Sequence, residues 1–488
     1  MSADDDDPLR RVRLDKLETL RGMGIDPYPV SFSRSDHAAA LDERYSALAV
    51  GAETNDHVRV AGRIRAMRNN GMFIDLHDAS GKIQVFSHKD FLAPDALALL
   101  RLVDIGDLIG VEGRVRRTPR GELTVNATAL TLLAKTLRPL PEKYHGLADI
   151  ELRYRQRYLD LIMNPQSRET LRRRSRIIAE MRAYLLAYDY LEVETPMLHA
   201  IPGGAAARPF VTHHNALDIE LYLRIAPELH LKRLVVGGLS DKVFEINRCF
   251  RNEGLSPRHN PEFTTLELYE AYADYTDMMT LTEQLVARVA ETAAGGLHLS
   301  YGGTAIDLTP PWPRRGMAEL VLEHTGIDFL ALDEDGAQKA LDRLHIEETE
   351  NWGRALEEAF SLHVEDKLIQ PTHVTGFPRD ISPLAKAYRT DPRLVERFET
   401  YVYGWEIANA FSELNDPLDQ RARFEAQMLA RAAGDEEAQP LDEDYVVALE
   451  YGLPPCGGLG LGIDRLVMLL TDSPSIRDVI AFPTLRPR

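Results

Sequence analysis

The sequence predicts an α+β protein in which a small N-terminal β-barrel precedes a larger region of helices and hairpins. Three observations support this prediction. Between Val58 and Leu133, apolar and polar residues alternate in short runs that turn residues separate. Beyond residue 150, helical patterns of apolar residues alternate with hairpin-like segments. A chain of 488 residues also exceeds the size of one ordinary core, so two or more domains are expected.

The composition is that of a globular enzyme, with 44% hydrophobic and 27% charged residues. A formal net charge of −19 argues against non-specific coating of nucleic acid or of an anionic membrane, although it permits a local basic patch. Cys249 and Cys456 are too few for a disulfide framework, a zinc ribbon or an iron–sulfur site. No run approaches the ~18 consecutive apolar residues of a membrane span, and no secretory signal precedes Leu9. We therefore expect a cytoplasmic protein without a membrane partner.

The N-terminal segment from Leu9 to Gly24 predicts an amphipathic helix that Gly22, Gly24 and Pro27 end. Its apolar stripe consists of Leu9, Val12, Leu17 and Leu20. Its other face is basic and carries Arg10, Arg11, Arg13, Lys16 and Arg21. This basic face is either simply solvated or an RNA contact.

Five short alternating runs with turn punctuation are typical of a small barrel of the oligonucleotide-binding kind. The runs are Val58–Ile64, Met72–Leu76, Lys82–Phe86, Leu108–Val115 and Leu123–Leu130. The second hairpin places Phe73, Gln84 and Phe86 on the strands whose outer face such barrels use. An exposed Phe can stack on a base and a Gln can pair with a base edge. Alternatively both Phe side chains fill the barrel, and this is the preferred interpretation for Phe86.

A segment rich in proline and charge, residues 138–149, marks a boundary. We expect a helical segment over residues 1–56, the barrel over 57–137, a linker over 138–150 and a second domain over 151–488. Within the second domain, residues of about 300–370 combine Pro-rich turns with acidic helices and predict an insertion of unread role.

The second domain begins with a long predicted helix, Arg168–Leu191, that runs into the strand-like LEVETPML. A helix feeding a strand that ends at proline could form a subunit interface. The following loop carries Gly204, whose lack of a Cβ permits close approach of a ligand. Glu228 then stands at the head of an apolar helix, where a carboxylate is often only a partner of the helix dipole.

The segment from Phe244 to Tyr275 predicts a hairpin with a charged loop. Arg251 offers a bidentate fork to a phosphate, and Phe263 offers a flat face to a base. The loop also contains Glu253, His259 and Asn260. The alternative is an edge hairpin whose loop charges are merely solvated.

A second predicted hairpin turns at Tyr403 and Gly404 and should bring Glu399 and Glu406 opposite each other. Paired carboxylates that face phosphates suit Mg²⁺, which prefers few protein oxygens together with substrate phosphates. Further along the same strand, three residues alternate on one face and could line a cation pocket or an ordinary strand face: Asn409, Phe411 and Glu413.

The C-terminal Gly457–Leu470 resembles a dinucleotide fingerprint, but its spacing is wrong and too little chain follows for a βαβ unit. A tight Gly-rich strand that leads into a helix with Arg465 in its first turn fits better. No activated nucleophile motif is present in the sequence. Arg251, Arg465, paired acidic groups and glycine loops together indicate positioning and charge stabilisation in phosphoryl or nucleotidyl transfer.

Taken together, four segments resemble the motifs of the bacterial lysyl-tRNA synthetases of the second synthetase class. The segments are LEVETPML with PGGAAARPF, FRNEGLSPRHNPEFTTLELYEAYADY, WEIANAFSELND and GLGLGIDRLVMLL. The resemblance extends from about Leu9 to Arg488. It implies an antiparallel sheet flanked by helices, an anticodon-binding barrel and a homodimer. It also implies ligation of L-lysine to tRNA(Lys) through a lysyl-adenylate, with ATP as co-substrate and Mg²⁺ as cofactor.

The resemblance assigns roles to individual residues. Arg251 would hold the α-phosphate and the substrate carboxylate. Adenine would lie between Phe263 and Arg465. The other contacts to ATP would come from Glu253, His259 and Asn260. Magnesium would be coordinated by Glu399 and Glu406. The lysine pocket would consist of Gly204, Glu228, Glu267, Tyr269, Asn409, Phe411 and Glu413. The anticodon contacts would be Phe73, Gln84, Arg68 and Glu122.

The chemistry of lysine agrees with this assignment, because its two ammonium groups can pair with Glu228, Glu267 and Glu413. The acidic pocket disfavours an aspartyl or asparaginyl synthetase, because an aspartate-specific pocket would need a cation at this place. A non-catalytic RNA-binding paralogue is disfavoured, because the two arginines, Arg251 and Arg465, and the two carboxylates predicted for the metal are present. A synthetase-like enzyme that lysylates a protein is also disfavoured, because such an enzyme is expected to lack the barrel that this sequence predicts.

Overall fold

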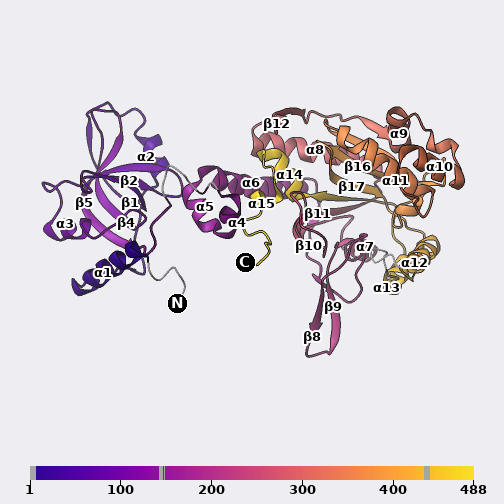
Figure 1. The fold of residues 1–488 in the computed structure, drawn as a ribbon, viewed down its shortest axis with the longest axis horizontal. Coiled ribbons are helices and arrows are strands. Elements are labelled where there is room, and N and C mark those ends of the chain that lie inside the picture. Colours follow the sequence, from indigo (N-terminus) through magenta and orange to yellow (C-terminus); the bar gives the residue numbers. More distant parts are fainter. Residues whose placement is uncertain (1–6, 142–146, 148, 433–439, 488) are drawn as a thin grey trace. The chain divides into compact units, whose positions relative to one another are not determined.

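The computed structural model describes residues 7–141, 147, 149–432 and 440–487, and the chain divides into two units. The first unit spans Met1–Gly146 and the second Leu147–Arg488 (Figure 1). The predicted N-terminal segment over residues 1–56 and the predicted linker over residues 138–150 lie partly outside the described residues. Within the described part of the chain, no helix is long and apolar enough to cross a membrane.

Five strands of the first unit close into the predicted barrel, in the order β1-β2-β3-β5-β4. The strands are β1 (Glu53–Arg68), β2 (Phe73–His77), β3 (Lys82–Phe86), β4 (Leu108–Arg117) and β5 (Leu123–Ala134). Neighbouring strands are antiparallel except for β3 and β5, which are parallel and complete the ring. A short helix that the sequence did not predict, α3 (Pro94–Leu100), contributes buried leucines to the barrel core.

The prediction that Phe86 fills the barrel is wrong. Alternation along β3 turns Ile83 and Val85 inward, so Gln84 and Phe86 lie on the outer face. Phe73 on β2 lies on the same face, and its ring centroid is 5.1 Å from that of Phe86. The two aromatic rings therefore form one partly exposed surface on β2 and β3.

The N-terminal helix α1 (Pro8–Gly22) confirms the predicted helix but not its whole apolar stripe. Leu17 and Leu20 are buried, whereas Leu9 and Val12 are about half exposed. On the basic face, the buried Arg13 donates to Thr136 Oγ1 over 2.6 Å and to the carbonyl oxygen of Ile105 over 2.8 Å. Arg13 thus anchors α1 to the barrel and is not available to RNA. The second helix of this unit is α2 (Ala38–Arg44).

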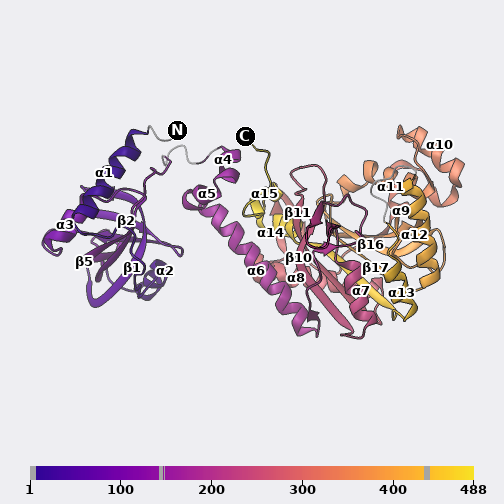
Figure 2. The same cartoon turned by 90° about the horizontal axis from the view of Figure 1, so that it is seen from below.

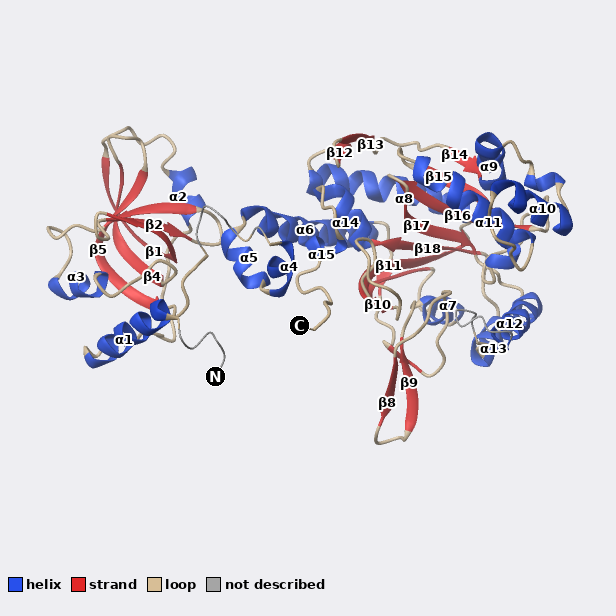
Figure 3. Cartoon of the chain, in the orientation of Figure 1, coloured by secondary structure: helices blue, strands red, loops and turns tan. Residues whose placement is uncertain are grey.

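The second unit is built on an eight-stranded sheet with the order β14-β15-β16-β17-β18-β11-β10-β6. The strands are β14 (Arg314–Gly316), β15 (Thr372–Pro378), β16 (Leu394–Val402), β17 (Trp405–Ser412), β18 (Cys456–Gly462), β11 (Glu262–Ala271), β10 (Lys242–Phe250) and β6 (Leu191–Glu192). Only the two edge pairs are parallel, which confirms the expected antiparallel sheet flanked by helices (Figure 3). Of LEVETPML, only Leu191–Glu192 and Leu198–His199 pair as strands, so the predicted continuous strand is wrong.

Helices α6, α8 and α14 pack together against one face of this sheet (Figure 2). Their bounds are Pro165–Ala187, Tyr275–Val289 and Ile463–Thr471. On α6, Ile177, Met181 and Leu185 are fully buried, as the predicted apolar stripe requires. The short helices α4 (Ile150–Arg155), α5 (Arg157–Met163) and α15 (Ile476–Val479) lie beside α6.

The opposite face of the sheet carries, over its central strands, a group of helices and a separate small sheet. The helices are α7 (Glu228–Val236), α12 (Pro417–Ala432) and α13 (Glu443–Glu450). The small sheet comprises β7 (Leu198–His199), β8 (Val211–His214) and β9 (Ile219–Leu223), and its β8–β9 hairpin extends away from the main sheet (Figures 1 and 3).

The segment of about 300–370 is ordered and belongs to the sheet at one end. It begins within the hairpin β12 (His298–Tyr301) and β13 (Thr304–Asp307), and it contributes β14 and the helices α9 (Met317–Thr325), α10 (Glu334–Leu344) and α11 (Trp352–His363). These helices share a core with β15 and β16, in which Phe329, Leu341, Trp352 and Phe360 are buried.

Candidate active site

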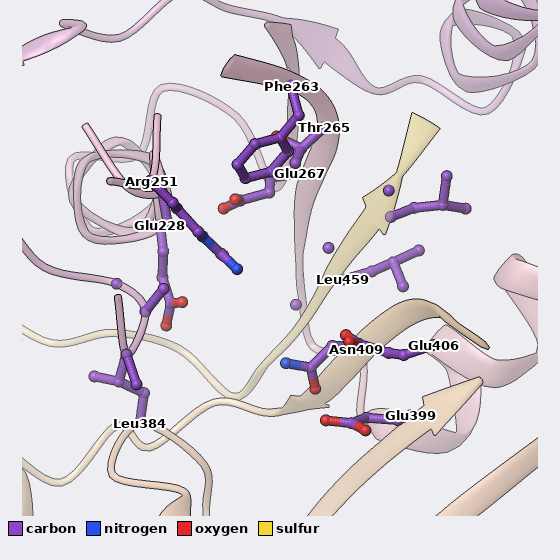
Figure 4. A pocket seen from close by; sticks show the side chains of 18 of the residues that line it. Glu228, Arg251, Phe263, Thr265, Glu267, Leu384, Glu399, Glu406, Asn409 and Leu459 are labelled. Atoms are coloured by element: carbon purple, nitrogen blue, oxygen red, sulfur yellow. The ribbon is translucent and has the colours of Figure 1, made fainter. Parts of the chain in front are cut away.

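A cavity of about 400 Å³ lies on the sheet face opposite α6, α8 and α14 (Figure 4). All the residues predicted for ATP, lysine and metal line this one cavity: Gly204, Glu228, Arg251, Glu253, His259, Asn260, Phe263, Glu267, Tyr269, Glu399, Glu406, Asn409, Phe411, Glu413 and Arg465. The sequence therefore identified its walls, whereas the individual binding roles stay predictions.

Alternation along β18 creates the floor of the cavity. Leu459 and Leu461 are buried in the core with α6, α8 and α14, so Gly458, Gly460 and Gly462 face the other side. Because these three positions carry no side chain, a channel runs across the middle of the sheet. The neighbouring strands supply the functional side chains on either side of that channel.

One row of paired residues crosses the floor from β11 to β16. Glu267 pairs with Gly460, Gly460 with Asn409, and Asn409 with Glu399. Burial, and then the nearby Glu228, raises the pKa of Glu267 to about 8. Near pH 7, the free protein therefore holds a proton on this carboxyl group for most of the time.

The adjacent row contains the best-defined steric constraint of the site. Gly458 pairs with Tyr269 on one side and with Phe411 on the other. A Cβ atom on Gly458 would lie 2.6 Å from Tyr269 Cε1 and still closer to Glu413 Oε1. Only glycine at this position allows the Tyr269 ring and the Glu413 carboxylate to occupy their places.

The prediction that Glu399 and Glu406 lie directly opposite each other is wrong. The two-residue turn at Tyr403 and Gly404 pairs Tyr401 with Glu406, and a bulge between Thr400 and Tyr401 then pairs Glu399 with Asn409. The bulge nevertheless leaves both carboxylates in the cavity wall (Figure 4).

The two carboxylates influence each other electrostatically. Burial, and then Glu406, raises the pKa of Glu399 to about 7. The Glu399 oxygens accept hydrogen bonds from Arg397 at 2.5 Å and from the Tyr401 hydroxyl at 2.6 Å. In the described part of the chain, no group of three or more His, Cys, Asp or Glu residues could hold a metal ion. A divalent cation here would need further ligands from a substrate.

Two arginines frame the end of the cavity predicted for ATP. The guanidinium carbon of Arg251 lies 5.2 Å from the centroid of the Phe263 ring, and its buried Nε has no hydrogen-bond partner among the described residues. Arg465 donates to the carbonyl oxygen of Glu406 at 2.6 Å and lies 3.1 Å from His259 Nε2. Burial, and then Arg465, lowers the pKa of His259, so its ring is neutral at pH 7. This end combines positive charge with a flat aromatic face.

Asn260 and Glu253 differ in what they do at this end. The buried Asn260 amide donates to the carbonyl oxygen of Glu262 at 2.6 Å and accepts from the amide of Thr484 at 3.3 Å. Asn260 therefore fixes the hairpin loop to the C-terminal segment as well as lining the cavity. Glu253 is exposed on the rim.

The end predicted for lysine is acidic and tightly built. Gly204 has a φ of +87°, and a Cβ atom there would lie 3.0 Å from Glu228 Cβ, so glycine permits this close approach. Burial raises the pKa of Glu413 well above its ordinary value, although Lys232 opposes this effect. Glu413 Oε1 has no hydrogen-bond partner among the described residues, whereas Oε2 contacts the Lys232 ammonium. A buried carboxylate in this state favours binding of a cationic ligand.

Lys232 is a residue of this site that the sequence did not reveal. Its ammonium lies 2.5 Å from Glu228 Oε1, forms an ion pair with Glu413 and is fully buried. The available signal was its position four residues after Glu228 on an apolar helix. A Glu–Lys pair at that spacing is normally a surface feature.

In the barrel, three of the predicted anticodon residues already have partners within the unit. Arg68 donates two hydrogen bonds to Asp75, at 3.0 and 2.9 Å. Gln84 accepts from the Thr124 hydroxyl at 3.1 Å, and Glu122 pairs with Lys82 at 2.6 Å. Phe73 lies on the aromatic surface that it shares with Phe86. The guanidinium carbon of Arg116 lies 4.5 Å from the centroid of the Phe86 ring. Their roles toward RNA stay predictions.

Comparison with known proteins gives the same two-part division. Residues 149–486 match the family model described as tRNA synthetases class II (D, K and N). Residues 58–133 match the model described as an OB-fold nucleic acid binding domain.

Curated relatives match the chain over nearly its whole length. The lysine--tRNA ligase of Synechococcus sp. (strain CC9311) is 56% identical over 98% of this chain and 99% of its own. The lysine--tRNA ligase of Rhizobium meliloti (strain 1021) is 55% identical, covering 98% and 96%. That of Moorella thermoacetica is 54% identical and covers both chains completely. The chain therefore belongs to the class II tRNA synthetases (D, K and N) and, within them, to the lysine--tRNA ligase family.

Proposed function

We propose that the chain ligates L-lysine to tRNA(Lys) in an ATP-dependent reaction that proceeds through a lysyl-adenylate. The observation that carries this proposal is the buried Glu413 carboxylate, whose Oε1 has no partner among the described residues, beside Glu228 and Glu267 in the same cavity as Arg251. Buried carboxylates need cationic partners, and lysine offers two ammonium groups. The names of the relatives support the same substrate.

In the first step, the lysine carboxylate attacks the α-phosphorus of ATP and expels pyrophosphate. Arg251 would bind both anions and align them, because a guanidinium offers several donors in one plane. Adenine would lie between Phe263 and Arg465. In the second step, a ribose hydroxyl at the 3′ end of the tRNA attacks the carbonyl carbon of the adenylate and releases AMP.

Mg²⁺ fits the pair Glu399 and Glu406, because these carboxylates face the cavity close enough for Glu406 to raise the pKa of Glu399. Two protein carboxylates with ATP oxygens and water match the preference of this ion. When bound, Mg²⁺ neutralises the charge that develops on the phosphates. Glu399→Gln should raise the Mg²⁺ concentration needed for half-maximal activity, and an unchanged requirement would count against this site.

Lysine-dependent ATP–pyrophosphate exchange, followed by charging of total tRNA, tests the proposed function. We expect exchange with lysine but not with aspartate or asparagine, and subsequent formation of lysyl-tRNA. Exchange that depends on aspartate or asparagine would reassign the substrate. RNA binding without any exchange would identify a non-catalytic paralogue.

The pKa of Glu267 predicts that lysine binding depends on pH. Below pH 8 the free carboxyl group carries a proton, which an incoming ammonium must displace. Lysine affinity should therefore increase from pH 6 to pH 8, by at most about tenfold per unit for one linked proton. Calorimetry in buffers of different ionisation enthalpy should detect a released proton at pH 7. Absence of proton release would contradict the prediction.

For the barrel, we infer that Phe73 stacks on an anticodon base. Phe73→Ala should raise the KM for tRNA roughly tenfold or more, since stacking on an aromatic side chain contributes about 1–3 kcal/mol per base. Lysine-dependent exchange in the same variant serves as the control and should not change, because the residue is outside the catalytic unit. An unchanged KM for tRNA would remove Phe73 from the interface.

We further propose a homodimer built through the end of α6 and the segment that follows it. Large apolar side chains are 39–54% exposed there, namely Leu186, Tyr188, Leu191, Leu198 and Ile201. Exposed large apolar side chains concentrated in one segment are typical of a protein interface. Sedimentation velocity at micromolar concentration should give twice the chain mass, and a monomer would contradict the proposal.

A further inference from the structure

We propose that Lys232 is a positioning residue for amino-acid recognition, which clamps Glu228 and Glu413 from behind the lysine pocket at a fixed spacing. This inference rests on the proposed function and adds a residue to it that contacts neither lysine nor ATP. The clamp would set the separation of the two carboxylates that receive the substrate's ammonium groups.

The clamp joins two elements that are far apart in the sequence. Glu228 begins α7 and lies one helical turn before Lys232, whereas Glu413 follows the last residue of β17. The Lys232 ammonium lies 2.5 Å from Glu228 Oε1 and contacts Glu413 Oε2. The backbone amide of Glu413 donates to the carbonyl oxygen of Cys456 at 2.8 Å, which fixes the chain at this point. A single ammonium therefore sets the relative position of α7 and the end of β17.

Lys232 does not compete with a substrate for this position. Its side chain is fully buried, whereas Glu228 and Glu413 line the cavity. Three rings surround the ammonium, with centroids of Tyr269, Phe411 and Tyr445 at 5.7, 5.4 and 5.9 Å. This aromatic enclosure excludes water, so the attraction between the ammonium and the two carboxylates is little screened.

The charges of the pocket balance only when Lys232 is counted. Three carboxyl groups, on Glu228, Glu267 and Glu413, face one fixed ammonium and the two ammonium groups of lysine. If all three carboxyl groups are ionised in the complex, the sum is zero, while the substrate carboxylate is left for Arg251. The other titratable groups that face Lys232 or its partner carboxylates are Tyr269, Tyr445 and Cys456.

Lys232 keeps its own proton in this environment. Burial alone would lower the pKa of Lys232, but Glu228 and Glu413 raise it well above the ordinary value. The phenols of Tyr269 and Tyr445 stay neutral, because burial raises the pKa of both. Without the ammonium, two buried carboxylates would repel each other, and one would take up a proton or turn away.

The test compares Lys232→Met, which keeps the length of the side chain and removes its charge, with the wild type in lysine-dependent exchange. We expect the KM for lysine to rise roughly tenfold or more, because a buried carboxylate loses its partner. The preference for lysine over ornithine, which is one methylene shorter, should fall, and the KM for ATP should not change. The KM for lysine should also improve more steeply with rising pH than in the wild type, because the unpaired carboxyl group titrates at higher pH.

A matched control is the next residue of the same helix. Arg233 pairs with Asp442 at 2.8 Å, and its guanidinium carbon lies 5.6 Å from the centroid of the same Tyr445 ring, but it does not line the cavity. Arg233→Met also removes an ion pair between α7 and the segment at α13. It should lower thermal stability without changing the KM for lysine or the preference over ornithine.

The outcomes separate this inference from the proposed function. If the wild type shows no lysine-dependent exchange, the proposed function fails and the inference fails with it. If the wild type is active and Lys232→Met keeps its KM for lysine, its preference and its pH profile, only the inference is overturned. Should Lys232→Met not fold, Lys232→Arg retains the charge but spaces the carboxylates differently. Its preference for lysine over ornithine should fall, and an unchanged preference overturns the clamp.

Discussion

Arg251→Ala is expected to reduce lysine-dependent ATP–pyrophosphate exchange by roughly a thousandfold or more, since a preorganised cation at the reacting phosphate supplies a large part of such catalysis. The Arg251 side chain stacks on Phe263 at 5.2 Å, and its buried Nε has no partner among the described residues. A guanidinium held in this way is oriented in advance for an anion. Arg251→Lys should also be strongly impaired, because an ammonium cannot form the bidentate contact.

The control for Arg251 is Arg248, on the preceding strand of the same hairpin. Its side chain lies 3.7 Å from Glu262 and does not line the cavity. Arg248→Ala should retain exchange, and both variants should show the thermal unfolding of the wild type. Near-normal exchange by a folded Arg251→Ala would remove Arg251 from the catalytic machinery.

Much of the fold could be predicted because its pattern is local. Apolar and polar residues alternate along the barrel strands. A charged loop between two alternating runs likewise predicts the hairpin of β10 and β11. The strand at Leu191 was overestimated, because apolar composition cannot tell which residues find a pairing partner. In the main sheet only Leu191 and Glu192 of this segment pair, at the outer edge.

The site was predictable where a residue type carries its chemistry with it, as do Arg251 and Glu413. It was not predictable where tertiary structure decides the role of an ordinary residue. Lys232 lies on a helix whose i,i+4 partner suggests a surface pair, and only the arrival of Glu413 from β17 turns it into a buried clamp. Arg13 likewise has the sequence context of a solvated or RNA-binding arginine, yet it donates hydrogen bonds to Thr136 and Ile105 of the barrel unit.

The pairing register of β16 and β17 is a second feature that could not be predicted from the sequence. We predicted that Glu399 faces Glu406, but the turn at Tyr403 pairs Glu406 with Tyr401, and the bulge pairs Glu399 with Asn409, while both side chains stay in the cavity. A bulge inserts one extra residue into one strand and so shifts every pairing beyond it. Function depends here on the face that a side chain occupies, and the face was predicted even though the partner was not.

The glycines of β18 were recognised as a tight strand, but their purpose becomes clear only from their neighbours. Gly458 lies between Tyr269 and Phe411 in the sheet, and Glu413 lies over it. Gly458→Ala should therefore act as a lesion of the lysine pocket, although the substitution adds a single methyl group. The methyl group would force both the Tyr269 ring and the Glu413 carboxylate out of their positions.

We expect Gly458→Ala to raise the KM for lysine roughly a hundredfold, about the effect of leaving buried charged groups unpaired, with little change in the KM for ATP. The comparison is Gly457→Ala on the same strand, where a Cβ atom would meet Met278 Cγ at 3.0 Å and the carbonyl oxygen of Asp274 at 3.1 Å. Those atoms belong to the start of α8, on the face away from the cavity. Gly457→Ala should thus lower the melting temperature and leave lysine recognition intact. If the two variants lose lysine recognition equally, the effect reflects general damage to β18, and the steric role of Gly458 in holding Glu413 is refuted.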